Sequence, residues 1–218
     1  MTDPVADLLI LGESVVMDIA NSWYVRPVGV IDFLCGRGSA LLWLHSMQFP
    51  AELVLPRRWS KADVARLRGL RDAVRHLLEA SVDGVDPDRR DVRLLNERAG
   101  AACHVVTLSW ASGRSPEAQR TVRGAPVPAL LGHLAAETIA VLTASSPPRV
   151  RRCAHPTCSV LFIQDHHKRH FCHPGCSHRD RQQRYVQTRH QRAPAATPRS
   201  TVSDADRAQL TRTPGSRS

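Results

Sequence analysis

The chain has 218 residues, enough for one medium domain and a smaller second part. Hydrophobic residues make up 42% of the chain, which allows a sizeable core and excludes a wholly disordered protein. No apolar run approaches the ~18 residues that span a bilayer, and the first residues lack the basic and apolar pattern of a secretory signal. We therefore expect a cytoplasmic protein with no membrane partner.

Apolar residues in the first two thirds of the chain recur mostly at helical spacing, which predicts a mainly α fold. The clearest helix covers 60–80, where Ser60 can cap the first turn and Asp63 suits the positive end of the helix. The other predicted elements are helices over 39–46, 88–102 and 128–144, and a short strand over 105–110.

The residues between these elements carry no motif that indicates catalysis. Cys35 and Cys103 have no neighbouring base or ligand, so we expect both to be small buried side chains. Gly36-Arg37-Gly38 is too short for a phosphate-binding loop. We expect no enzyme here, and we place the tryptophans in the core: Trp23, Trp43, Trp59 and Trp110.

The net charge of +10 is concentrated in one segment. Residues 1–148 carry 16 Lys and Arg against 16 Asp and Glu, whereas residues 149–192 carry 10 against 2. A neutral body joined to a basic segment is typical of proteins that bind a polyanion, most often nucleic acid. Residues 193–218 hold almost no large apolar residue, so the predicted parts are a body, a basic module and a disordered tail.

Four cysteines fall within 24 residues of the basic segment, as Cys153-x4-Cys158-x13-Cys172-x3-Cys176. Two close pairs of thiolates supply the four ligands of a tetrahedral, structural Zn²⁺ site. Two disulfides or an iron–sulfur cluster could use the same residues. A reducing cytosol disfavours the disulfides, and the spacing is closer to that of zinc modules. The spacing therefore predicts one structural zinc ion.

Seven histidines lie in the same segment, and His155 and His173 are the ones best placed to replace a thiolate. Because four cysteines already saturate the ion, we expect the histidines to face solvent or phosphate. A closed four-thiolate site leaves no position for water or substrate, which argues against hydrolysis by this module.

The segment between the cysteine pairs is predicted to form a hairpin, with arms over 160–163 and 168–171 around a turn over 164–167. Cys172 and Cys176 are four residues apart, as on one turn of a helix. A knuckle, a hairpin and a helix that begins at the second pair make a small treble-clef-like zinc module.

Arginines lie on one face of the helix predicted after Cys176, and that face has no acidic residue. Such a face suits phosphate oxygens or guanine edges, although a solvated charged helix is the alternative. The predicted nucleic-acid contacts are Lys168, Arg169, Arg179, Arg181, Arg184, Arg189 and Arg192.

Several short motifs follow one another in an order that is similar to a known family. In the basic segment they are Arg152-Cys153-Ala154-His155-Pro156-Thr157-Cys158, Arg169-His170-Phe171-Cys172 and Cys176-Ser177-His178-Arg179. In the body they are Met17-Asp18-Ile19-Ala20-Asn21-Ser22, Leu42-Trp43-Leu44, Leu67-Arg68-Gly69-Leu70-Arg71 and Leu94-Leu95-Asn96. Residues from about 12 to 192 resemble the CGNR zinc finger proteins with an N-terminal ABATE domain, which are described as stress-induced transcription regulators. Ser177-His178 replaces the Gly-Asn pair of the namesake motif.

Together these observations predict a zinc-dependent, DNA-binding transcription regulator whose helical body senses a signal or dimerises. A module that binds RNA, or one that docks on an acidic protein, is the alternative, and the small number of aromatic residues disfavours RNA. A homodimer formed through the body would extend the short DNA site that one module can read.

Overall fold

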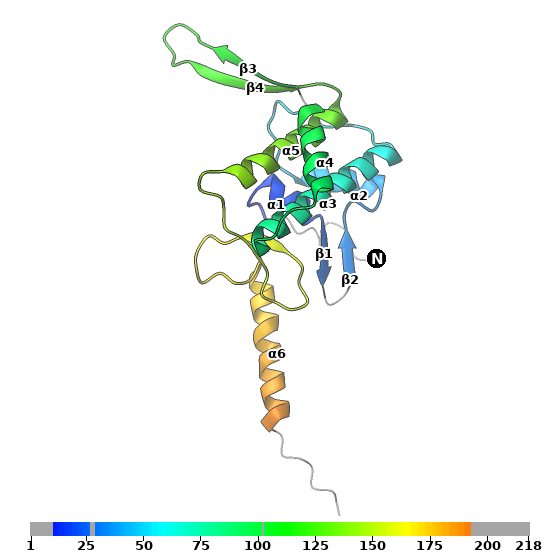
Figure 1. Ribbon diagram of the computed structural model, residues 1–218, viewed down its shortest axis with the longest axis vertical. Coiled ribbons are helices and arrows are strands. Elements are labelled where there is room, and N and C mark those ends of the chain that lie inside the picture. Colours follow the sequence, from blue (N-terminus) through cyan, green and yellow to red (C-terminus); the bar gives the residue numbers. More distant parts are fainter. Residues whose placement is uncertain (1–10, 27–28, 102, 193–218) are drawn as a thin grey trace, which may run out of the picture. The chain divides into compact units, whose positions relative to one another are not determined.

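The computed structural model of the chain describes residues 11–26, 29–101 and 103–192 (Figure 1). The chain divides into two compact units, Met1–Asp180 and Arg181–Ser218. The tail predicted over 193–218 lies outside the described residues. A mainly helical domain, with a small strand pair and a helix beside the cysteine cluster, is confirmed.

Helices and two-stranded antiparallel sheets alternate along the described chain, and each sheet pairs two strands that are consecutive in sequence. The elements are α1 (Val15–Ala20), β1 (Trp23–Arg26), β2 (Gly29–Asp32), α2 (Arg37–Ser46), α3 (Lys61–Asp83), α4 (Arg89–Ala101), β3 (Cys103–Ser109), β4 (Glu117–Arg123), α5 (Pro126–Thr143), β5 (Val150–Arg152), β6 (Leu161–Ile163) and α6 (Pro174–Arg192).

Helix α3 is the longest element and confirms the helix predicted over 60–80. The Ser60 hydroxyl accepts a hydrogen bond from the Asp63 backbone N–H, and the Asp63 carboxylate accepts one from the Ser60 backbone N–H. This reciprocal cap satisfies two N–H groups that have no partner inside the helix. Gly84 ends the helix with φ +66°, a left-handed conformation that favours glycine.

The core of the first unit lies between α1, α3, α4 and α5. Helix α5 is long and apolar enough, by length and composition alone, to cross a membrane. Its residues Leu130, Leu131 and Leu134 are buried, however, and the helix contacts α1, α3 and α4. This burial is what a core helix of a globular domain shows.

Two of the four predicted core tryptophans, Trp43 and Trp59, are buried. Trp23 is half-buried, and the placement of Trp110 was wrong, because its side chain is 67% exposed. Cys35 is also exposed rather than buried. Trp110 is not part of an apolar repeat along a helix, so the local sequence pattern does not show whether its side chain is buried or exposed.

The strand predicted over 105–110 is confirmed by β3, and its partner β4 was not predicted. In the cysteine-rich segment β6 confirms the first predicted arm, but it pairs with β5 rather than with 168–171. The Ala154 N–H donates to the His170 carbonyl, and the Arg169 N–H donates to the His166 carbonyl in a turn. The first bond holds 168–171 against the first cysteine knuckle, and these residues form no strand.

Candidate metal centre

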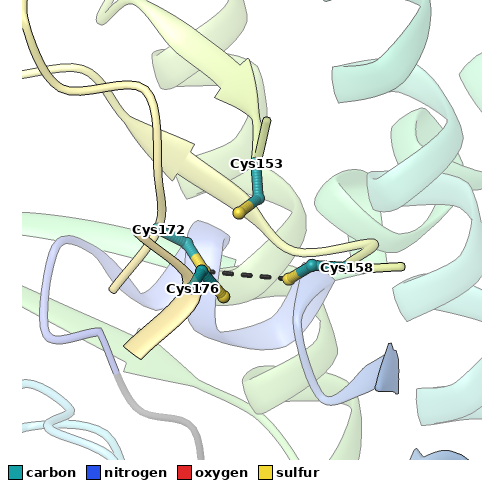
Figure 2. Close-up of side chains that lie close together, drawn as sticks. All are labelled: Cys153, Cys158, Cys172 and Cys176. Carbon is teal, nitrogen blue, oxygen red and sulfur yellow. Dashed lines mark hydrogen bonds between the residues drawn. The ribbon is translucent and has the colours of Figure 1, made fainter. Parts of the chain in front are cut away.

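The four predicted zinc ligands meet at one point of the first unit (Figure 2). Cys153 directly follows β5, Cys158 lies in the turn that leads to β6, Cys172 precedes α6, and Cys176 lies in the first turn of α6. All four Sγ atoms lie within 4.8 Å of one another, and three of the four residues are buried. The spacing therefore identified a real cluster.

The sulfur separations match the size of a zinc site. Cys172 Sγ lies 3.8 Å from Cys158 Sγ and 3.7 Å from Cys176 Sγ. A tetrahedron with Zn–S bonds of ~2.3 Å has edges of about 3.8 Å between its sulfurs. The donor set and its geometry fit one structural zinc ion.

The thiols of the cluster lie close enough to change one another's pKa. Hydrogen bonds from the neighbouring thiols, that of Cys158 above all, lower the pKa of Cys153 to about 2. The interaction with Cys153 raises the pKa of Cys158 to about 12, and it raises the pKa of Cys172 as well. The shared hydrogen bonds thus favour the thiolate form of Cys153 and the thiol form of Cys158 and Cys172. A bound divalent metal ion favours the thiolate form of its ligands.

Neither candidate histidine belongs to the cluster. His155 is buried, and its Nδ1 contacts the Thr157 hydroxyl at 3.1 Å. His173 Nδ1 accepts a hydrogen bond from the Gly175 N–H at 3.1 Å. Both rings shape the backbone beside a cysteine. The four thiolates therefore form the ligand set.

Arg169 was predicted to contact nucleic acid, but the structure gives it an internal role. Its guanidinium donates to the carbonyls of Ile163 and Cys172, both at 3.1 Å. It also forms an ion pair with Glu13 at 2.7 Å and lies 4.8 Å from the centre of the Phe162 ring. Because these donors are occupied, Arg169 holds the segment that carries Cys172 against the body. We therefore leave Arg169 out of the residues proposed to contact nucleic acid.

Arg179 likewise faces the cluster. Its Nη2 lies 3.0 Å from Cys176 Sγ, one helical turn away on α6. A guanidinium that donates to a metal-bound thiolate orients the sulfur and stabilises its negative charge. Arg179 is therefore a positioning residue of the metal centre.

The other predicted contacts are exposed wherever their side chains are described. Lys168 lies on the surface of the first unit, and Arg181, Arg184 and Arg189 lie on that of the second. The Arg189 guanidinium is 5.9 Å from the centre of the Tyr185 ring. The structure does not describe the side chain of Arg192.

The metal centre is attached to the helical body by buried polar contacts. Asn21, at the end of α1, donates to the Leu161 carbonyl at 2.7 Å and accepts from the Leu161 N–H at 3.0 Å. Glu13 accepts from the Ile163 N–H at 2.6 Å. Two residues of the body thus form hydrogen bonds with strand β6, which begins three residues after Cys158.

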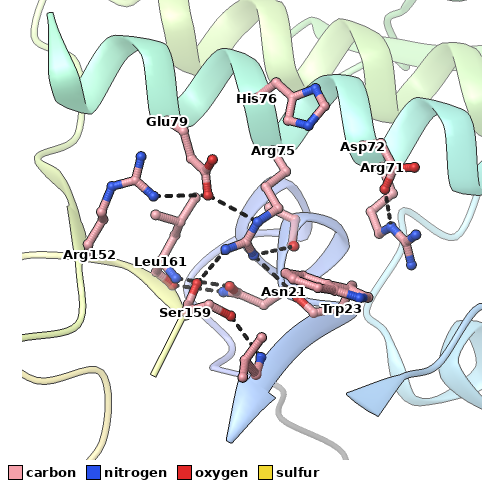
Figure 3. A network of polar contacts seen from close by, with 12 residues as sticks. Asn21, Trp23, Arg71, Asp72, Arg75, His76, Glu79, Arg152, Ser159 and Leu161 are labelled. Atoms are coloured by element: carbon pink, nitrogen blue, oxygen red, sulfur yellow. Dashed lines mark hydrogen bonds and ion pairs between the residues drawn. The ribbon is translucent and has the colours of Figure 1, made fainter. Parts of the chain in front are cut away.

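Arg75 of α3 is the centre of a second set of contacts (Figure 3). Its buried guanidinium donates to the carbonyls of Ala20, Trp23 and Ser159 and pairs with Glu79 at 3.1 Å. Burial lowers the pKa of Arg75, while the Glu79 carboxylate opposes that change. Because Ser159 follows the ligand Cys158, this arginine links α3 to the metal centre.

Glu79 also joins the cysteine-rich segment to α3 through a second arginine. Arg152, which precedes the ligand Cys153, lies 3.0 Å from the Glu79 carboxylate and 2.7 Å from that of Asp83. These ion pairs are partly exposed, so each contributes little alone. Together with Arg75 they set the position of β5 on α3.

Sequence reasoning missed the roles of Glu13, Asn21 and Arg75. A signal existed for Asn21 only, because it lies in one of the short body motifs, Met17-Asp18-Ile19-Ala20-Asn21-Ser22. The contacts of all three cross from the body to the cysteine-rich segment. No local pattern reveals such pairs.

Two family models match the chain. The ABATE model, described as "Putative stress-induced transcription regulator", matches residues 13–145, and the CGNR zinc finger model matches residues 149–190. A comparison with curated proteins gives no match. The first range contains Asn21 and Arg75, and the second contains the four cysteines and Arg179. The chain therefore belongs to the ABATE family and carries a CGNR zinc finger that holds one structural zinc ion.

Proposed function

We propose that this protein is a cytoplasmic transcription regulator that binds duplex DNA through its zinc finger and α6. One observation carries the proposal: residues 181–189 of α6 are all exposed and include three arginines but no acidic residue. Arginine forks at this spacing can contact phosphate oxygens and guanine edges.

The exposed part of α6 has no buried apolar face to stabilise it. Even its largest apolar side chains, Tyr185 and Val186, are 64% and 50% exposed. A helix that is exposed all round gains little from packing. Its exposed arginines suit the phosphates of duplex DNA better than an apolar protein surface.

The metal centre has a structural role in this proposal. Four thiolates leave Zn²⁺ no open position for water or substrate, so we assign no catalysis to the site. When bound, zinc joins the first knuckle to the start of α6 through Cys172 and Cys176. The ion would thereby fix the turn from which the helix begins.

The internal roles of Arg169 and Arg179 reduce the proposed contact set. It consists of Lys168, Arg181, Arg184, Arg189 and Arg192. Five phosphate contacts give a log-log salt slope of about −4.5 on duplex DNA.

Fluorescence anisotropy of the full zinc-loaded chain on random duplex DNA, at several salt concentrations, tests the proposal. The test variant changes Arg181, Arg184 and Arg189 to Glu. The matched control changes Arg57, Arg58 and Arg89 to Glu; these side chains are also exposed but belong to the body. Binding with a steep salt slope, lost in the test variant and retained in the control, supports the proposal.

Two outcomes would reject DNA as the partner. Tighter binding to single-stranded or double-stranded RNA than to duplex DNA would favour an RNA-binding finger. No binding to either nucleic acid at low salt would favour a finger that docks on an acidic protein.

A further inference from the structure

Residues of α3, α4 and α5, three helices that contact one another (Figure 1), enclose a cavity of about 380 Å³. Its floor is apolar and buried, since Leu77 is 6% exposed and Leu95 is 4% exposed. Its rim opens to solvent at Val85 and Val92, which are 59% and 36% exposed. The cavity therefore leads from the surface into the core of the body.

The described residues that line this cavity include no charged side chain. The polar ones are Ser81, Asn96 and Thr143, and the others are aliphatic or proline. The Thr143 hydroxyl donates to the Ile139 carbonyl at 2.8 Å. The Ser81 hydroxyl and the Asn96 amide have no hydrogen-bond partner among the described residues. Apolar walls with a few free polar groups are the usual lining of a small-molecule site.

The size of the cavity indicates a small molecule rather than a protein as its occupant. Pockets for small ligands typically measure roughly 300 to 1,000 Å³, a range that includes this one. A stable protein interface needs about 20 to 30 residues on each side. Because 11 residues line the cavity, it is too small for such an interface.

The surroundings of the rim favour an uncharged ligand. An adjoining cavity of about 550 Å³ shares Pro87, Val92 and Asn96 with the first one. It carries two acidic and two basic residues, so it favours neither sign of charge: Asp86, Arg89, Arg93 and Glu97. A charged group inside the first cavity would lose its hydration without gaining a partner of opposite charge.

We infer that the cavity between α3, α4 and α5 binds an uncharged, mainly apolar small molecule with one hydrogen-bonding group. The apolar part covers Leu77 and Leu95, and the polar group bonds the Asn96 amide. Binding removes the apolar surface of Val85 and Val92 from water, which supplies the affinity.

Helix α3 connects this cavity to the metal centre. Leu77 and Ser81 line the cavity, whereas Glu79 and Asp83 form ion pairs with Arg152, which precedes the first zinc ligand. At about 100° per residue, the two pairs of positions lie about 160° apart around the helix. A ligand that moves this end of α3 therefore also moves the start of the finger. This regulatory consequence, unlike the binding itself, rests on the proposed function.

Isothermal titration calorimetry of the full zinc-loaded chain without nucleic acid tests the inference. The probe is naphthol, and naphthalenesulfonate is its charged counterpart. Ala80→Phe fills the cavity with a ring, and Ala65→Phe is the matched control, because Ala65 is exposed on the same helix and does not line the cavity. Asn96→Ala removes the proposed polar contact. Circular dichroism and zinc content verify that every variant is folded.

We expect the wild type and Ala65→Phe to bind one naphthol per chain and to bind naphthalenesulfonate more weakly. Ala80→Phe should weaken naphthol binding about tenfold or more, because the added ring takes the ligand's space. Asn96→Ala should weaken it about fivefold, the effect of one neutral hydrogen bond. The absence of saturable binding, equal affinity for the sulfonate, or unchanged binding in both cavity variants would overturn the inference.

A failure of this test is separate from a failure of the proposed function, because no DNA is present in the titration. Anisotropy on duplex DNA with saturating naphthol then measures the connection through α3. A changed affinity for DNA supports that connection, and an unchanged affinity rejects it.

Discussion

Asn21 and Leu161 are 140 positions apart in the sequence and are joined by two hydrogen bonds. The side-chain amide of Asn21 donates to the Leu161 carbonyl and accepts from the Leu161 N–H. One residue closes α1 in the ABATE domain, and the other begins β6 of the zinc finger. The contact is buried, so both sides depend on it for their hydrogen bonds. The finger up to Asp180 therefore forms one compact unit with the helical body.

This pair predicts that the Asn21 amide contributes strongly to holding the finger on the body, beside the contacts of Glu13 and Arg75. Asn21→Ala leaves the buried N–H and C=O of Leu161 without partners, which should cost about 2 to 4 kcal/mol. Thermal unfolding of the zinc-loaded protein measures the loss. Asn96→Ala is the control, since Asn96 is exposed on α4 and should cost under about 0.5 kcal/mol. Equal effects of the two changes would refute the role of Asn21.

Removal of one zinc ligand should affect the body as well as the finger. Cys172→Ser takes away a buried ligand that neighbours two other sulfurs. We expect the bound zinc to fall from one ion per chain to near zero and the melting temperature to drop, because metal binding contributes directly to folding. Elemental analysis and calorimetry measure both. Cys35→Ser, at an exposed free cysteine, should keep the full zinc content.

Two nearby arginines of α6 should separate metal binding from nucleic-acid binding. Arg179→Gln removes the donor to Cys176 Sγ and should weaken zinc binding about tenfold, as changes beside metal ligands usually do. Arg181→Gln should leave zinc affinity unchanged and weaken DNA binding. Competition with a chelator and anisotropy measure the two affinities. If both variants lose zinc equally, the contact of Arg179 with sulfur has no specific function.

The buried carboxyl of Asp18 predicts a pH dependence of stability. Burial raises its pKa to about 6, although the Leu11 N–H donates to it at 3.1 Å. The folded state therefore favours the protonated form. Its contribution to stability is present in full below the unfolded pKa of about 3.9 and is lost as pH rises through about 6.

Asp18→Asn keeps an acceptor for Leu11 and carries no charge. It should stabilise the protein by roughly 1 to 3 kcal/mol at pH 8, and the advantage should shrink as pH falls through 6. Denaturant unfolding of both proteins between pH 5 and 8 provides the comparison. A difference that is constant with pH would show that ionisation of Asp18 does not set it.

Features that depend on a few neighbouring residues were predictable. The Ser60 cap and the apolar repeat of α3 both depend on residues of one helix. Their partners lie three or four residues away in the sequence, so the pattern can be recognised from the sequence alone. The zinc ligands were predictable for the same reason, since each cysteine pair reaches the ion over a short loop. The resemblance to the CGNR family rested on this local spacing.

Features that depend on distant residues required the tertiary structure. An arginine near a cysteine in the sequence can face solvent or the interior. In the fold, Arg169 contacts Glu13 and the Cys172 carbonyl, and Arg179 contacts the Cys176 sulfur. The pairing of β6 with β5 and the exposure of Trp110 were decided in the same way. The sequence by itself determined helices α2 to α6 and the ligand set, because short-range hydrogen bonding and chelation fix them, whereas α1 was not predicted. Only the tertiary structure decided which polar groups meet across the chain, because burial of an unpaired polar group is costly and each must find a partner wherever the fold supplies one.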